Sequence, residues 1–215
     1  MSLYDDIRAF VPGCEQEVAD RDLLLDRLDC DPHVADRASI AHLTTSAWAV
    51  SPDGCQTLLV YHNIYDSWSW VGGHADGEQD LASVALRELA EETGVMGAHV
   101  VAGASADRDA ASPVFSVEAL PVAGHVRRGS YVGSHVHLNV TYLVVADPDC
   151  PLREKPDENS GVRWVPIEKV CELSSEPWMC EHVYAKLIER TRAAVAAGLC
   201  SEADANVYKC SDGCI

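Results

Sequence analysis

The segment from residue 77 to residue 94 constrains the fold most, because both ends and one face of a helix can be located in it. Asp80 is a candidate N-cap, and Gly94 stands just past the apolar pattern, where a glycine commonly ends a helix. At about 100° per residue, one arc of this helix is apolar. The arc consists of Leu81, Ala82, Ala85, Leu86 and Leu89. We therefore expect an amphipathic helix that packs on a core.

Three glutamates lie on the same helix, at Glu88, Glu91 and Glu92. Their i, i+3 and i+4 spacing places them in one arc beside the apolar face, where they can meet one ligand. Like charges at this spacing cost about 0.2–0.5 kcal/mol per pair, and acids near a helix C-terminus oppose the helix dipole. Arg87 offsets only part of this repulsion, so a hard divalent cation is expected to complete the neutralisation. Since Mg²⁺ shares its coordination between carboxylates and phosphate oxygens, the substrate is expected to carry phosphate.

A bare ExxEE pattern on a helix is more often a solvated acidic face than a metal site, but here the flanking residues favour the metal site. The segment Gly73–Val95 resembles the Nudix box, G-x5-E-x7-R-E-U-x-E-E-x-G-U with U apolar. The positions in register are Gly73, Arg87, Glu88, Leu89, Glu91, Glu92, Gly94 and Val95. So many fixed positions in a loop-helix context make the match specific.

The segment departs from the Nudix box at two places. Gln79 stands where the box has its leading glutamate, and Glu78 lies one position earlier. Either Glu78 replaces the leading glutamate as an extra metal ligand or support, or the supporting role of that glutamate is missing in this chain. Val71 stands where a proline commonly precedes the glycines, which leaves the loop less preorganised.

The resemblance implies an α/β fold, an α/β/α sandwich with a mixed β-sheet. It also implies a hydrolase that cleaves a diphosphate linkage in a nucleoside diphosphate derivative, or a similar small molecule, by attack of water on phosphorus. The implied cofactor is Mg²⁺, with Mn²⁺ as the alternative, held by Glu88, Glu91, Glu92 and the Gly72 carbonyl oxygen. Glu88 or Glu91 is expected to orient or deprotonate the water. Arg87 is expected to brace the carboxylates through ion pairs.

The chain divides into three expected regions: an N-terminal helical extension (1–38), a Nudix domain (39–197) and a tail (198–215). The extension has a helical pattern interrupted by Pro-containing turns at Pro12-Gly13 and Asp31-Pro32. The domain has β-branched and aromatic runs that predict strands at 43–50, 57–63, 113–121, 135–146 and 161–165, and helices near 167–174 and 178–197. This order suits a mixed sheet with helices on both faces.

The chain is strongly acidic, with 16 Lys plus Arg against 34 Asp plus Glu and a net charge of −18. This charge repels a nucleic-acid polymer, so the expected partner is a small-molecule diphosphate. The first residues do not read as a secretory signal, and no stretch approaches the roughly 18 apolar residues of a membrane helix. We therefore expect a cytoplasmic protein without a membrane partner. The sequence leaves a homodimer open.

The nine cysteines contain no CxxC pair, and an odd number cannot be fully paired within one chain. Reduced thiols in a reducing compartment are the favoured interpretation. A metal site formed by Cys210 and Cys214 in the tail is a minor alternative.

Candidate substrate contacts lie outside the box. Trp68 and Trp70 should share one face of a strand, either to stack on a nucleobase or to pack in the core. Arg127 and Arg128 form a compact basic spot, which suits a phosphate or an exposed turn equally well.

Two further groups of residues are candidate ligands, a histidine pair and a set of loop acids. His137 shares a strand face with His135, and a substrate contact or an ordinary strand position is favoured over a metal pair. Glu158 is a candidate extra carboxylate for the metal site, because related enzymes often supply one from outside the box. Asp157 and Glu154 compete with it, and a solvated loop acid is the simpler account.

Two other functions remain open beside hydrolysis. A non-catalytic nucleotide-ligand sensor would keep the fold without turnover, although the intact glutamates and the lack of a DNA-binding extension count against it. A prenyl-diphosphate isomerase of the same fold would need a catalytic cysteine, and no cysteine in the sequence is marked for this role. Specificity lies in loops outside the box, so the sequence does not name the substrate.

Overall fold

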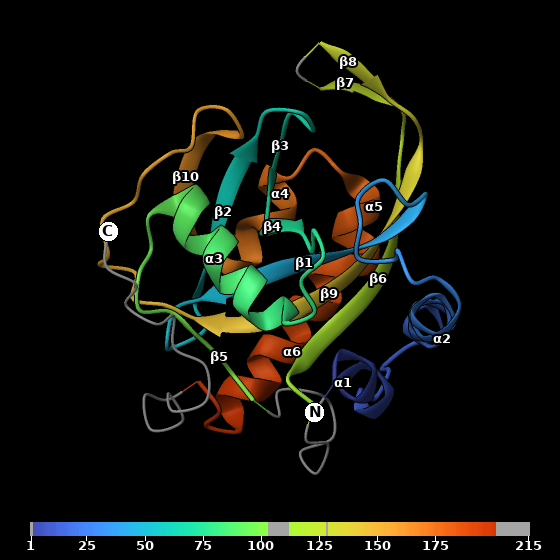
Figure 1. The fold of residues 1–215 in the computed structure, drawn as a ribbon. Coiled ribbons are helices and arrows are strands. Elements are labelled where there is room, and N and C mark those ends of the chain that lie inside the picture. The colour runs from blue at the N-terminus through green and yellow to red at the C-terminus, as the bar shows by residue number, and fades with distance from the viewer. Residues whose placement is uncertain (1, 103–111, 128, 201–215) are drawn as a thin grey trace.

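The computed structural model describes residues 2–102, 112–127 and 129–200 of the chain. An eight-stranded sheet forms its centre (Figure 1). The main path consists, in spatial order, of β10 (Asn159–Pro166), β2 (Gln56–His62), β1 (Ala41–Val50), β9 (His135–Val145) and β5 (His99–Val100). The short strands β3 (Ser67–Ser69) and β4 (Val71–His74) pair with β2 and β1, and β6 (Val114–Val122) pairs with β9.

Strands β1 and β9 run parallel, whereas the other paired strands of the sheet are antiparallel. The sheet is therefore mixed, as the sequence predicts. The parallel register aligns Ala41 with Val136 and continues residue by residue to Val50 opposite Val145. Parallel neighbours need a long connection, and this one contains β2, the glycine loop (residues 72–77, of which the first three belong to β4), helix α3 (Leu81–Thr93) and β6. Two segments far apart in sequence thus lie side by side at the centre of the sheet.

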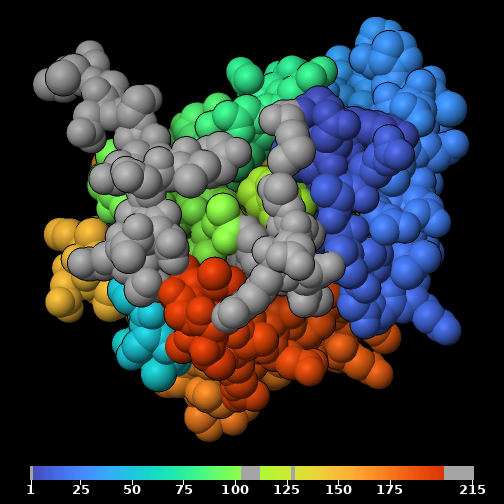
Figure 2. Space-filling view, turned by 90° about the horizontal axis from the view of Figure 1, so that it is seen from below, coloured from blue at the N-terminus to red at the C-terminus, as the bar shows by residue number. Residues whose placement is uncertain are grey.

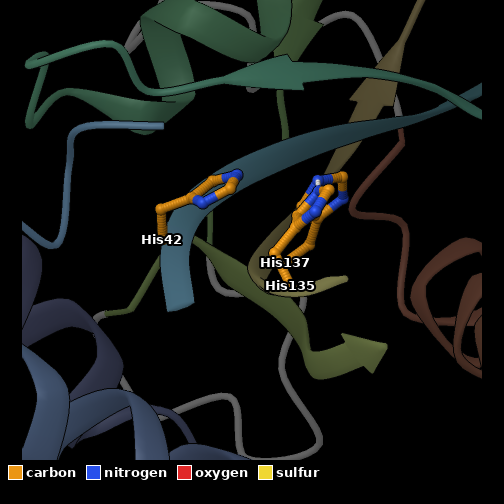
Figure 3. A group of neighbouring side chains, drawn as sticks. All are labelled: His42, His135 and His137. Carbon is orange, nitrogen blue, oxygen red and sulfur yellow. Dashed lines mark hydrogen bonds between the residues drawn. The ribbon is translucent and has the colours of Figure 1, made fainter. Parts of the chain in front are cut away.

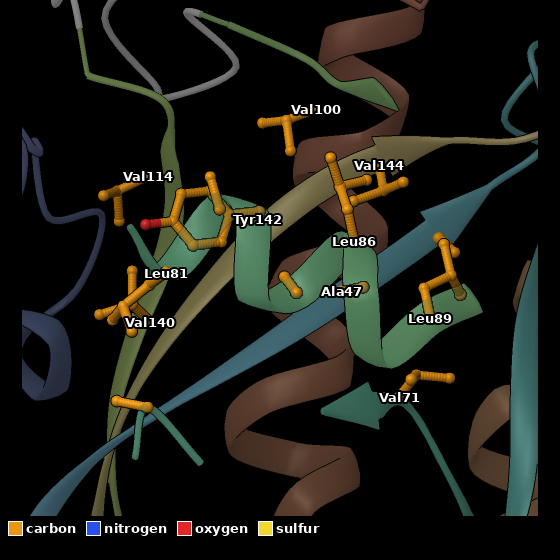
Figure 4. Packing of buried hydrophobic residues seen from close by; sticks show 14 of the residues in the cluster. Ala47, Val71, Leu81, Leu86, Leu89, Val100, Val114, Val140, Tyr142 and Val144 are labelled. Carbon is orange, nitrogen blue, oxygen red and sulfur yellow. The ribbon is translucent and has the colours of Figure 1, made fainter. Parts of the chain in front are cut away.

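Alternation along β1 supplies a side chain to each face of the sheet in turn. Leu43, Ala47 and Ala49 pack in the core beneath α3, where Leu81, Leu86 and Leu89 meet Val140, Tyr142 and Val144 (Figure 4). Trp48 and Val50 enter a second core on the opposite face, under the C-terminal helices. The fold is therefore an α/β/α sandwich, which confirms the predicted fold class.

Helix α3 begins and ends as the local sequence predicts. The Asp80 carboxylate accepts a hydrogen bond from the Ser83 backbone N–H at 3.1 Å, and Gly94 takes the left-handed conformation with φ of 78°. The predicted apolar arc is buried, and Glu92 is buried beside it with 3% exposure. A carboxyl that is this well buried keeps its charged form only with a partner or a ligand.

The opposite face of the sheet is covered by a series of C-terminal helices. These are η1 (Ile167–Lys169), α4 (Val170–Leu173), α5 (Pro177–Met179), the π-helical segment η2 (Cys180–Tyr184) and α6 (Ala185–Ala196). They match the two predicted helical regions. Tyr184 and Leu187 are fully buried in the second core and anchor this layer.

Two N-terminal helices, α1 (Leu3–Ala9) and α2 (Glu15–Cys30), lie beside β6 and α6 (Figures 1 and 2). Leu3, Ile7 and Leu24 join the core beneath α3, so these helices contribute apolar surface to the main body. Their separation as a domain at residue 38 stays a prediction. A small hairpin of β7 (His125–Arg127) and β8 (Ser130–Val132) projects from the end of the sheet. In the ranges that the structure describes, no helix has the length and apolar character needed to cross a membrane.

Candidate functional site

The glycine loop that precedes α3 is held close to strand β1. In the antiparallel pairing of β4 with β1, Gly72 lies opposite Ser46 and Gly73 opposite Thr45. A Cβ atom at Gly72 would come 2.6 Å from the Thr45 carbonyl oxygen, and one at Gly73 would come 2.5 Å from Glu88 Cδ. Neither position has room for a side chain, so both glycines are required by close packing.

Three carboxylates meet beneath this loop. Ligand oxygens of Glu88, Glu92 and Glu158 all lie within 4.8 Å of one another. Glu88 and Glu92 are one helical turn apart on α3, and Glu158 comes from the loop before β10. The structure thus places Glu158, a carboxylate from outside the box, next to Glu88 and Glu92.

Asn159 holds the loop that carries Glu158. Its buried side-chain amide donates to the Glu92 carbonyl oxygen at 3.0 Å, and its Oδ1 accepts from the Lys155 backbone N–H at 3.1 Å. On the other side of the loop, the Asn63 backbone N–H donates to the Glu158 carbonyl oxygen at 3.1 Å. The position of the third carboxylate therefore depends on the end of α3 and on β2 together.

Burial and mutual repulsion shift the acids of this group. Burial, followed by the charges of Glu158 and Glu88, raises the pKa of Glu92 to about 8. Burial and the neighbouring Glu91 also raise the pKa of Glu88. Such shifts are expected where several carboxylates are withdrawn from water around one point, and they favour the arrival of a positive charge.

Glu91 takes a different position from the other two glutamates of the helix. It is 49% exposed, and its carboxylate lies 3.3 Å from Lys155 Nζ and 3.9 Å from Arg87 Nε. Lys155 Nζ also lies 3.0 Å from the Glu158 carboxylate, so Lys155 links the exposed Glu91 to the group of three carboxylates. The three helix glutamates therefore do not all converge as expected. Glu88 and Glu92 come together, whereas Glu91 faces Lys155 and Arg87. Ligand roles for Glu91 and Arg87 stay predictions.

Glu78 and Gln79 lie in the exposed turn before α3. Among the described residues, Glu78 does not belong to the group of converging carboxylates. Its part as a replacement for the leading glutamate stays a prediction.

A family comparison adds to this geometry. The family model described as NUDIX domain matches residues 41–189, which is well over half of the chain. The chain belongs to the NUDIX family. It is a NUDIX hydrolase, in agreement with the sequence resemblance and the sandwich fold. The match extends from the first residue of β1 into α6, so it includes the glycine loop, α3 and Glu158.

Three solved structures resemble this NUDIX chain. A NUDIX-family hydrolase from Clostridium perfringens shares 16% identity and covers 71% of this chain and 97% of its own, with a TM-score of 0.47. A C. elegans Ap4A hydrolase binary complex shares 16% identity and covers 72% and 98%, with a TM-score of 0.48. The NUDIX domain of Shewanella oneidensis NrtR, complexed with ADP ribose, shares 22% identity and covers 79% and 97%, with a TM-score of 0.45. A comparison with curated proteins found no match.

The carboxylates of the NUDIX chain open onto a cavity of about 890 Å³. Its lining includes Glu88, Glu92 and Glu158 at one side and Trp70, Tyr65 and Trp178 elsewhere. Among the described residues of the lining, Arg37 is the single lysine or arginine, and its Nε donates to Asp76 at 2.6 Å. This lining offers little positive charge of its own to a phosphate.

The two tryptophans that precede the glycine loop, Trp68 in β3 and Trp70 after it, have different surroundings. Trp70 lines the cavity and meets the buried Tyr184 edge to face, with ring centroids 5.7 Å apart. Trp68 is covered by the Arg163 guanidinium, 4.1 Å from its ring centroid, and contacts Tyr61. Both also pack partly on the second core. Trp70 is therefore placed for contact with a ligand, whereas Trp68 is committed to other protein groups.

His137 also lines the cavity, together with His135 and the buried His42. The sequence predicts that His135 and His137 share a strand face but does not place His42 with them. Only the parallel pairing of β1 with β9 brings His42 beside them, and no local signal in the sequence could have identified it. Of the remaining candidates, Arg127 ends strand β7, and Arg128, Cys210 and Cys214 lie outside the described residues.

Proposed function

We propose that this NUDIX hydrolase cleaves the diphosphate linkage of a nucleoside diphosphate derivative by attack of water on phosphorus, with Mg²⁺ as its cofactor and Mn²⁺ as the alternative. The observation that carries the proposal is the convergence of Glu88, Glu92 and Glu158 beneath the two loop glycines, at the wall of a large cavity. A sensor of nucleotide ligands would not need three acids held together against their mutual repulsion.

The donor set fits a hard divalent cation. All three side chains offer carboxylate oxygens, and Mg²⁺ and Mn²⁺ prefer such ligands. The raised pKa of Glu92 also supports a bound cation. Burial beside Glu158 and Glu88 disfavours the ionised carboxylate, and a nearby positive charge would stabilise it. Gly72, whose carbonyl oxygen was expected as a further ligand, lies at the same wall of the cavity.

The charge of the cavity supports a cation requirement for substrate binding as well. A diphosphate carries at least two negative charges. The described lining contains five acids, Glu88, Glu92, Asp157, Glu158 and Glu176, and its single lysine or arginine is the ion-paired Arg37. When bound, a divalent cation would neutralise phosphate oxygens and make a nearby water more acidic. The chain itself would hold the diphosphate against the glycine loop, where no side chain intervenes.

The size and lining of the cavity support a substrate larger than inorganic diphosphate. A volume of about 890 Å³ lies in the range of drug-sized ligands, about 300–1,000 Å³. Trp70, Tyr65 and Trp178 provide aromatic surface on which a nucleobase or another flat group can stack. We propose that the nucleoside part lies against these rings.

For the proton transfer, we propose that Glu88 orients or deprotonates the attacking water. It borders the cavity, and the raised pKa of its carboxyl is closer to neutrality than that of an exposed glutamate. Glu91 is the second candidate, although its pairing with Lys155 and Arg87 holds it at the rim. In this proposal Arg87 and Lys155 position Glu91 rather than contact the substrate.

We also propose that the enzyme works in the cytoplasm on small molecules. Seven cysteines of the described ranges are free thiols, which suits a reducing compartment. The acidic net charge of −18 argues against a nucleic-acid polymer as substrate. A homodimer is compatible with the proposal and is not required by it.

The deciding experiment is a turnover screen of nucleotide sugars, dinucleoside polyphosphates, dinucleotide cofactors and oxidised nucleoside triphosphates, with and without Mg²⁺. We expect metal-dependent release of a nucleotide or phosphate, and a loss of at least about 100-fold in kcat/KM for Glu88→Gln and Glu92→Gln. Glu172→Gln, at an exposed position of helix α4, is the matched control and should retain activity.

Three outcomes would contradict the proposal. Tight nucleotide binding without turnover would favour a sensor, and rearrangement of isopentenyl diphosphate without release of phosphate would favour an isomerase. Equal rates for the wild type and Glu92→Gln would remove the carboxylate group from the mechanism altogether.

A further inference from the structure

Three histidines of the cavity lining form a second group, separate from the group of three carboxylates. His42 stands opposite His137 in the parallel register of β1 and β9, and His135 lies two residues before His137 on the same face of β9 (Figure 3). One ring nitrogen from each of the three histidines lies within 4.8 Å of the others. His74, the residue after Gly73, stacks on His42 with ring centroids 5.2 Å apart.

Backbone carbonyls orient two of these rings. His42 Nδ1 lies 2.7 Å from the Ser39 carbonyl oxygen, and His135 Nδ1 lies 2.8 Å from the Gly133 carbonyl oxygen. Since a carbonyl can only accept, each Nδ1 carries the proton and each Nε2 presents a lone pair. This is the arrangement in which metal-ligating histidines are held by a second hydrogen bond.

The Nε2 atom of His42 is the strongest sign of a missing ligand. His42 is 2% exposed, and within the described chain its Nε2 is buried without a hydrogen-bond partner. A buried polar atom without a partner costs about 1–3 kcal/mol. This cost is removed if the lone pair binds a cation, whereas a simple packing role would leave it in place.

His137 completes the set. Without a metal, its Nε2 donates a hydrogen bond to the His135 Nε2 lone pair at 3.1 Å, and the same spacing suits two nitrogen ligands of one ion once that proton has left Nε2. Burial, followed by the neighbouring His74 and His42, lowers the pKa of His137 to about 2. The imidazole is therefore neutral at physiological pH, which is the form that binds a metal.

We propose that His42, His135 and His137 form a second metal site, for a borderline transition-metal ion of which Zn²⁺ is the biological candidate. Three neutral imidazoles suit Zn²⁺ and its neighbours in the transition series, whereas Mg²⁺ takes oxygen ligands and belongs with the carboxylates. Three protein ligands leave the fourth position of a tetrahedron open. Since all three histidines line the cavity, that position faces the space where a substrate would lie.

The site does not depend on the proposed hydrolysis and can be tested separately with Co²⁺, a spectroscopic substitute for Zn²⁺. The full chain, freed of metal with a chelator, is titrated with Co²⁺ in the presence of excess Mg²⁺ to occupy the carboxylates. We expect one Co²⁺ per chain with the visible absorption of a tetrahedral nitrogen site, displaced by Zn²⁺.

Variants assign the site to its residues. His135 and His137 are only partly buried, so His135→Ala and His137→Ala should fold, as circular dichroism will check, and should weaken Co²⁺ binding by at least about 100-fold. His33→Ala removes an exposed histidine and should leave the spectrum unchanged. Glu92→Gln should also leave it unchanged, which separates this site from the hydrolytic one.

Three results would overturn the site. These are no bound Co²⁺ in the wild type, a spectrum that survives both histidine substitutions, and a thiolate charge-transfer band that accounts for all the bound ion. The last result would place the metal on cysteines. A chain that fails to hydrolyse any substrate but gives the expected Co²⁺ spectrum would contradict only the proposed function.

Discussion

The backbone of Gly73 lies directly against the side chain of Glu88, so that a Cβ atom at position 73 would approach Glu88 Cδ to 2.5 Å. The loop glycine and the helix glutamate are fifteen positions apart in the sequence and form one packed unit in the fold. The glycine is therefore needed for the space that it leaves and not for an unusual backbone angle. A substitution at Gly73 should therefore affect activity, whereas a substitution at a glycine with positive φ and open space should affect mainly stability.

Substitution of Gly73 by alanine is expected to displace the Glu88 carboxylate. Since a displacement of about 1 Å at a reacting centre can cost about 100-fold in rate, we expect a loss of that order in kcat/KM. Gly77→Ala is the matched control, because Gly77 has a φ of 94° but open space around its Cβ position. It should cost about 1 kcal/mol of stability with activity retained. Steady-state kinetics and thermal melts of both variants will check this.

Substitution of Glu92 by glutamine is expected to separate stability from function. The glutamine keeps the shape of the side chain but removes a carboxyl whose pKa is raised to about 8 by burial and by the charges of Glu158 and Glu88, a shift that destabilises the metal-free fold above pH 4.5. The metal-free variant should therefore melt higher than the wild type, by about 2–4 °C for each kcal/mol gained, while activity falls. Thermal melts with chelator, and then with Mg²⁺, give the measurement. A metal-free melting temperature below that of the wild type would contradict the repulsion.

Substitution of Asn159 by alanine is expected to loosen the loop that carries Glu158. It removes hydrogen bonds to the Glu92 carbonyl and the Lys155 amide, at a cost of about 1–3 kcal/mol. We expect kcat to fall more than KM rises, because the carboxylate and not the substrate pocket is displaced. Asn63→Ala is the control, since the exposed Asn63 side chain bonds the same loop at 3.3 Å through Pro156. Similar losses in both variants would show that Asn159 has no special part.

The ion pair of Glu17 with Arg190 predicts a pH dependence of stability. Burial raises the pKa of Glu17, but the hydrogen bond from Arg190 and the charge of Lys186 outweigh it and lower the pKa below its usual 4.5. A carboxyl with a lowered folded-state pKa stabilises the fold above pH 4.5, and this contribution is lost as the pH falls through the folded-state pKa. Glu17→Gln should thus cost about 3–5 kcal/mol at neutral pH and much less in acid.

Urea denaturation at neutral and acidic pH measures this difference. Glu15→Gln, at an exposed position of the same helix, should have little effect at either pH. A stability difference between the wild type and Glu17→Gln that does not change with pH would show that the pair does not titrate as proposed.

Local signals explain which parts of the fold could be predicted. The ends of α3 depend on Asp80 and Gly94, both within one residue of the helix, and its buried face depends on a repeat of 3.6 residues. The five longer strands of the sheet, β1, β2, β6, β9 and β10, were located in the same way from runs of β-branched and aromatic residues. These features depend on interactions between residues close together in the sequence, so they can be predicted without knowledge of the fold.

The sites depend on contacts between distant segments. Glu158 reaches the carboxylates of α3 through Asn159 and the end of the helix, and His42 reaches His137 through the parallel pairing of β1 and β9, 95 residues apart. By itself the sequence determined the helix that carries the glutamates, the glycine loop above it and the family. The tertiary structure alone decided which acid joins Glu88 and Glu92, that Glu91 faces Lys155, and that three histidines meet. The reason is that strand order and register are set by burial across the whole sheet, and no local pattern contains that information.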